Sequence, residues 1–238
     1  MKVKTPHMLL ILVAALFFFG NLTASKAVVQ NALHLAQEQA RSGENNNELI
    51  LAGASAFEDM AEAAFTGDKK GITLALQGYE KQAGLLGIML PVQQLNVLRE
   101  QVGNIRTATG QGNFAVVALQ ATGAYLTLTE SLDRSNLSVP IEVALLDYAG
   151  FKFQALLLAK PIAWDSLLET VNQARSNWTL LKEKISDSKL AEAMDVAIEG
   201  MTSAQESRNT GMALLAARVD LALVDLLEAS FEKTPGRK

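Results

Sequence analysis

The chain has no cysteine, five prolines and two histidines in 238 residues. Without cysteine, disulfides, thiolate metal sites and cysteine nucleophiles are excluded. His7 falls in the N-terminal leader, so His34 is the one histidine expected in the mature chain. A histidine-rich zinc, haem or di-iron site is therefore not expected, and a Ser-His-Asp triad would depend on His34 alone.

Motifs of catalysis are also missing from the sequence. There is no Gly-x-Ser-x-Gly element, and no glycine-rich phosphate loop follows a predicted strand. We therefore expect a protein that is not an enzyme and that carries no cofactor and no metal.

The composition favours helix nearly throughout. Hydrophobic residues make up 49% of the chain and charged residues 19%, with Ala, Leu, Gln and Glu abundant. Segments that alternate β-branched or aromatic residues with polar ones, as strands do, are missing. The sequence predicts an all-α protein, either a multi-helix bundle or a helical-hairpin repeat, with about eight to nine helices.

Residues 1–27 have the three parts of a signal peptide. A cationic MKVKTPHM is followed by the apolar run LLILVAALFFFG and then by small residues, Ser25 and Ala27, at cleavage-site spacing. We expect export by a cleaved signal to the periplasm, or secretion. The alternative is an uncleaved N-terminal anchor, which would be the one expected contact with a membrane. The net charge is −4, and loss of the leader lysines makes it more negative, which argues against nucleic-acid binding.

Glycines, prolines and polar runs divide the remaining chain into helical segments. A polar loop is expected at Arg41–Asn47. The expected helices are Val28–Ala40, Glu48–Phe65, Ile72–Leu90, Pro91–Ala108, Asn113–Leu132, Val139–Ala159, Trp164–Ile185, Lys189–Ser207 and Met212–Phe231.

The segment Val139–Ala159 has apolar residues on every side of a helical wheel. Such a helix is either buried in protein or spans a membrane. Glu142, Asp147 and Lys152 recur through it, and each central charge would cost about 2.5–3.5 kcal/mol in lipid. The segment is therefore predicted to be the interior helix of a helical protein.

The sequence around Asp133–Ser138 is the best internal boundary, between a first helical unit at 28–135 and a second at 136–238. Laying Phe114–Glu130 on Met212–Glu228 pairs several alanines, Leu128 with Leu226 and Glu130 with Glu228. This pattern favours two duplicated four-helix units. Because alanine-rich helices also align by chance, the alternative is that the two halves are not duplicated. The sequence does not decide whether the halves form one bundle or two.

Asp220 is the most informative single residue, because its neighbours at helical spacing are apolar. A buried carboxylate needs a partner or a raised pKa. Lys152 and Arg175 are possible partners, which would make Asp220 part of a core ion pair, and an exposed helix edge is the other structural reading. The functional alternative is a polar anchor in a ligand pocket. On that reading the candidate ligand-binding residues are Asp220, Asp147, Lys152 and Trp178.

Carboxylates recur at helical spacing in two places, and such groups can share a hard cation such as calcium. No Glu-x-x-His accompanies either group, so solvated acidic faces are expected rather than metal sites. The two groups are Glu58, Asp59 and Glu62, and Glu192, Asp195 and Glu199.

These observations predict an exported, non-enzymatic interaction or adaptor protein that presents a helical surface to a protein partner. The alternative is a small-ligand or metal-binding helical bundle, acting as a carrier or sensor. A closed apolar cavity at Asp220 would favour the alternative, whereas a packed interior with an exposed apolar groove would favour the adaptor. The sequence does not predict the oligomeric state.

Overall fold

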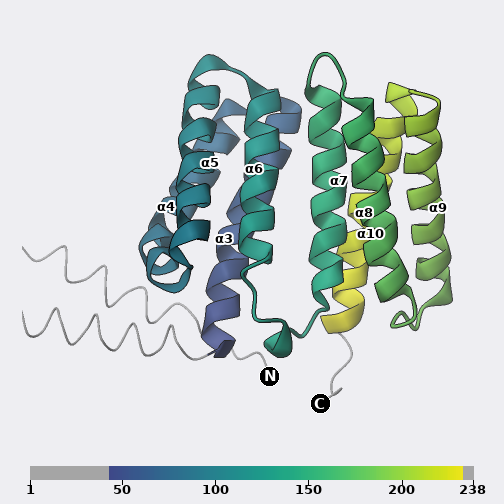
Figure 1. The fold of residues 1–238 in the computed structure, drawn as a ribbon, viewed down its shortest axis with the longest axis horizontal. Coiled ribbons are helices and arrows are strands. Elements are labelled where there is room, and N and C mark those ends of the chain that lie inside the picture. The colour runs from purple at the N-terminus through teal and green to yellow at the C-terminus, as the bar shows by residue number, and fades with distance from the viewer. Residues whose placement is uncertain (1–42, 233–238) are drawn as a thin grey trace, which may run out of the picture. The chain divides into compact units, whose positions relative to one another are not determined.

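The computed structural model describes residues 43–232, which form eight α-helices, labelled α3 to α10, and one 3-10 turn, η1 (Figure 1). No strand occurs over this range, so the all-α prediction is confirmed there. The predicted signal peptide and the predicted helix Val28–Ala40 lie outside the described residues. The elements are α3 Gly43–Thr66, α4 Lys69–Met89, α5 Val92–Gln111, α6 Phe114–Thr129, η1 Arg134–Asn136, α7 Ile141–Leu158, α8 Trp164–Lys182, α9 Ser188–Glu206 and α10 Thr210–Glu232.

Several helices begin at side chains that cap their free N–H groups. The Asp68 carboxylate accepts hydrogen bonds from the backbone N–H of Lys70 and Gly71, both at 3.0 Å, where α4 starts. Asn113 caps α6 and Asp187 caps α9 in the same way. Gly112 ends α5 in the left-handed conformation, at φ 70°, which a glycine adopts without steric cost.

The loop predicted at Arg41–Asn47 is wrong from Gly43 onward, because α3 already begins there. Asn47 is only 4% exposed. Its side-chain amide donates to the Asp133 carbonyl at 2.9 Å, and its side-chain oxygen accepts from the Asp133 N–H at 2.8 Å. This tertiary pairing with the chain after α6 stabilises a first turn whose polar residues resemble a loop.

The helices pack in two sets of four. In the first set, α3 packs against α4 and α6, and α5 packs against α6, with a slighter contact between α4 and α5. In the second set, α7 packs against α8 and α10, and α9 packs against α8 and α10. The two sets thus have the same cycle of neighbours, an arrangement that a duplication would produce. The sets join where α6 and α3 pack on α7 (Figure 1).

Helix α7 is enclosed as the sequence predicts for an interior helix. It contacts α3, α6, α8 and α10. The buried apolar residues form three clusters, and α7 contributes to all of them. Its contributions are Phe151 and Ala155 to the first cluster, Val143, Leu146 and Ala149 to the second, and Phe153, Leu156 and Leu157 to the third. The interior is therefore packed around a single helix.

Among the helices in residues 43–232, none combines the length and the apolar character that crossing a bilayer requires.

Substituting Phe151 by Asp tests the enclosure of α7. Phe151 is 5% exposed, and its ring lies 6.1 Å from that of Phe65 and 6.2 Å from that of Tyr125. An unpaired charge at this place should lower the free energy of unfolding by about 4 kcal/mol or more. Chemical denaturation measures the loss. The control is Leu180→Asp on α8, where the leucine is 59% exposed and little change is expected. Equal effects at the two positions would contradict the enclosure.

Candidate functional site

Ionisable residues meet where the two sets of helices join. Glu58 of α3, Tyr125 of α6 and Asp147 of α7 interact there, and the Glu228 carboxylate of α10 is close enough to act on all three by its charge. The side chains of Glu58 and Asp147 are hydrogen-bonded to each other. The Tyr125 hydroxyl lies 3.3 Å from the Ala144 carbonyl oxygen, to which it donates. Each of the four central helices thus brings one polar group to the junction.

Burial in this junction changes the protonation of its carboxyl groups. Desolvation, reinforced by the charge of Glu228, raises the pKa of Glu58 from 4.5 to about 7. Desolvation and the charges of Glu58 and Glu228 raise the pKa of Asp147 well above 3.8. Two carboxyl groups that share one hydrogen bond hold a proton between them more firmly than either does alone. The pair therefore keeps a proton to a higher pH than an exposed pair would.

An acidic surface continues outward from the junction along α3 and α10. Burial and the charges of Asp59 and Asp225 raise the pKa of Glu62, and burial and the charges of Asp225 and Glu232 raise the pKa of Glu228. Like charges therefore face one another between these helices. Within residues 43–232, no group of three or more acidic or histidine side chains has the arrangement of a metal site.

Asp220 is buried as the sequence predicts, at 0% exposure. It lies on α10 against Gly150 of α7, where a Cβ atom would come within 2.7 Å of the Asp220 carboxylate. Neither carboxylate oxygen has a hydrogen-bond partner among the described residues. Desolvation alone raises the pKa of this group to about 7. The glycine makes room for the carboxyl group but offers it no polar contact.

The partners considered for Asp220 are wrong. The Lys152 ammonium lies 5.4 Å from the centre of the Tyr148 ring, a cation–π contact on the same helix. The Arg175 guanidinium donates to the Thr202 hydroxyl at 2.8 Å, on the side of α8 that faces α9. Both cations therefore remain near the surface, where they keep water contact that pairing inside the core would remove.

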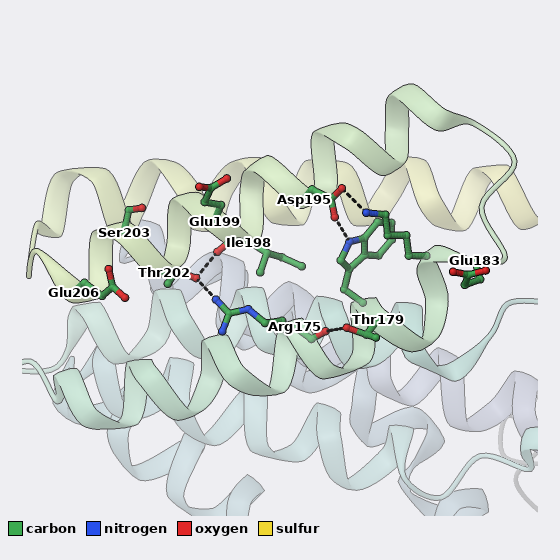
Figure 2. A pocket seen from close by; sticks show the side chains of 11 residues that line it. Arg175, Thr179, Glu183, Asp195, Ile198, Glu199, Thr202, Ser203 and Glu206 are labelled. Atoms are coloured by element: carbon green, nitrogen blue, oxygen red, sulfur yellow. Dashed lines mark hydrogen bonds and ion pairs between the residues drawn. The ribbon is translucent and has the colours of Figure 1, made fainter.

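Trp178 lies in a different place from the predicted aspartates. It lines a surface pocket of about 590 Å³ between α8 and α9 (Figure 2). Its indole N–H donates to one Asp195 oxygen at 2.7 Å, while the Lys182 ammonium lies 2.6 Å from the other. These hydrogen bonds lower the pKa of Asp195. The structure therefore does not bring Trp178 together with Asp147, Lys152 and Asp220 in one pocket.

The outer face of α10 carries a row of apolar residues that α7 and α9 do not cover. The exposed fractions include 65% for Leu215, 55% for Leu226, 42% for Val219 and 39% for Met212. Alanines occupy the remaining positions of the row. We call this row the α10 stripe: Met212, Leu215, Val219, Ala222, Leu226 and Ala229.

Comparisons with protein families, with curated proteins and with solved structures find no match to this chain.

The sequence predictions missed two of these features. Glu58 is indicated only as part of a solvated acidic face, because nothing in the sequence pairs it with Asp147. The α10 stripe has a signal in the sequence, since its members alternate at three- and four-residue spacing. The signal is easily missed because Ala217, Val224 and Leu227 form a second apolar row on the same helix.

Replacing Glu58 by Gln should alter the pH dependence of stability. Since the pKa of Glu58 rises on folding, the native state binds more protons than the unfolded state between about pH 4.5 and 7. The free energy of unfolding of the wild type should therefore fall as pH rises through this range, by up to about 1.4 kcal/mol per pH unit. The variant should lose less, as measured by urea denaturation at several pH values. Glu100→Gln, at an exposed site on α5, is the control, and a variant profile parallel to the wild type would contradict the shared proton.

Replacing Asp220 by Asn, which has nearly the same shape, removes the charge. Because the pKa of Asp220 rises on folding to about 7, the folded protein keeps this proton between about pH 4 and 7. Asp220 should therefore contribute up to about 1.4 kcal/mol per pH unit to the decline of wild-type stability over this range. The variant should lack this contribution, and its advantage over the wild type should grow toward pH 7. Thermal unfolding at matched pH values measures the difference, with the exposed Asp165→Asn as control. Identical profiles for the Asp220→Asn variant and the wild type would rule out a perturbed acid.

Proposed function

We propose that this chain is an exported, non-enzymatic interaction protein that presents the outer face of α10 to a protein partner. The observation that carries the proposal is the α10 stripe. Large exposed apolar side chains at Leu215 and Leu226 are costly for a protein to keep in water, and a contiguous row of them marks an interaction surface.

The spacing of the stripe indicates the kind of partner. Its six positions alternate by three and four residues and extend along about 26 Å of helix, at 1.5 Å per residue. This alternation presents a straight seam, and a second helix is the element that packs along such a seam. Arg218 and Asp225 border the seam and offer polar contacts at its edge.

The packed interior supports the same proposal. The Asp220 carboxyl group lies against Gly150 with no exposed surface, so it has no room for a ligand beside it. A carrier or sensor built on Asp220 would need a cavity at this place. Export is the part of the proposal that rests on the leader sequence alone.

Ligand binding at the α8–α9 pocket is the second candidate. Trp178 in that pocket favours it, because an indole ring offers an apolar contact surface. The charged groups beside the ring already satisfy one another, however, since Asp195 accepts from both Trp178 and Lys182. A ligand would have to displace these contacts, so this candidate ranks below the interaction surface.

Photo-crosslinking in the native host tests the proposal. A photoreactive amino acid at position 215 should form adducts with protein, because the proposed partner covers this position. The same substitution at Leu180, which is 59% exposed on α8, should form few or none. Adducts are detected by gel shift and identified by mass spectrometry.

The outcome that would contradict the proposal is equal labelling at positions 215 and 180, or no protein adduct at 215. A cross-link from 215 to the segment before Gly43 of the same molecule would also contradict it, since the stripe would then be covered from within. Circular dichroism of each variant verifies that the substituted proteins are folded.

A further inference from the structure

We infer that the α10 stripe binds the α10 stripe of a second copy of this chain, with the two helices antiparallel about a two-fold axis. This inference rests on the proposed function, because it names the partner of the same surface. Three features of α10 carry it: the order of large and small residues, the two border charges and the acidic surroundings of one of them.

The first feature is the order of large and small residues along the stripe, which is complementary to the same order read in the opposite direction. In an antiparallel pair centred between Asp220 and Leu221 of each chain, the stripe positions meet as Met212 with Ala229, Leu215 with Leu226, and Val219 with Ala222 of the second copy, and each pairing occurs twice. Two of the three kinds of layer set a large side chain against alanine, and the third sets leucine against leucine. Large residues opposite small ones allow two helices to approach closely along the whole seam.

The second feature is the charge at the border of the stripe. Arg218 and Asp225 are one heptad apart on the same edge, and both are exposed. In antiparallel pairs the residues of this edge face the same edge of the partner helix, so Arg218 lies near Asp225 of the second copy. Because the dimer has two-fold symmetry, this ion pair occurs twice. In a parallel pair the same two residues would face the opposite edge, where Leu223 and Ser230 stand.

The third feature is that both charges lack an opposite partner among the residues that the structure describes. No ion pair of Arg218 or Asp225 occurs among the described residues. Asp225 instead stands beside acids, since its charge helps to raise the pKa of Glu62 on α3 and of Glu228 on α10. A guanidinium from a second copy would relieve this repulsion.

Analytical ultracentrifugation of the full chain gives the first test. The wild type should sediment as a dimer at micromolar concentration. Leu215→Glu should convert it to a monomer by placing charges in a leucine layer. Leu180→Glu, which changes a leucine of similar exposure on α8, should leave the dimer intact. A monomeric wild type, or a dimer that survives Leu215→Glu, would overturn the inference.

Charge exchange tests the antiparallel arrangement. Arg218→Asp and Asp225→Arg should each weaken the dimer about tenfold or more, because each sets like charges opposite one another twice. An equimolar mixture of the two variants should restore dimerisation, since every Arg–Asp pair is then recovered between unlike chains. The double variant should restore it within one chain type. Failure of both the mixture and the double variant to recover would refute the antiparallel pairing.

These results separate the inference from the proposed function. If the wild type is monomeric while position 215 cross-links to a different protein, the second copy is wrong and the interaction surface stands. If position 215 forms no protein adduct at all, the proposal of an interaction surface is wrong.

Disulfide cross-linking gives a further test of the antiparallel arrangement, because the chain has no cysteine of its own. A mixture of the Leu215→Cys and Leu226→Cys variants should form a disulfide between the two chains only in the antiparallel dimer.

Discussion

Enclosure of α7 by helices on several sides is the constraint on which the rest of the structure depends. This helix is apolar around its circumference, so it reaches low free energy only when neighbours from both sets of helices cover it. The chain before α7 supplies α3 and α6, and the chain after it supplies α8 and α10. The two sets are thereby held to one another through a shared helix rather than by a linker.

The same enclosure determines the chemistry of the interior. The packing buries Asp220 fully beside Gly150 and Asp147 on α7 in part, and neither carboxyl group has a basic residue among the described ones that lowers its pKa. Protonation is then the less costly state, because an ionised carboxylate in apolar surroundings loses its hydration without compensation. Such groups contribute to a stability that depends on pH, and they do so without forming a binding cavity.

Helix α10 links the interior to the proposed interaction. Its inner row, with Asp220, Val224 and Leu227, packs on α7 and α9, and its outer row remains in solvent. A helix with one apolar face can pack either in a core or against a partner, whereas a helix with two apolar faces can do both at once. The corresponding helix of the first set, α6, packs on α7 instead, so the two sets differ at this place despite their common cycle of neighbours. The hypothesis of duplication accommodates this difference, since α10 packs on two helices, α7 and α9, whereas α6 packs on three, α3, α5 and α7.

The sequence by itself determined the elements of this protein: the all-α class, the succession of helices, the enclosed position of α7 and the burial of Asp220. These follow from local periodicity, from caps such as Asp68 and from the apolar character of single segments, all of which act over a few residues. Only the tertiary structure decided that Glu58 meets Asp147, that Asn47 pairs with Asp133, that Trp178 lies apart from the aspartates, and which face of α10 stays exposed. Each of these contacts depends on which helices become neighbours. The set of neighbours is determined by the packing of helix faces that are far apart in the chain, and a pattern of a few consecutive residues carries no information on that packing.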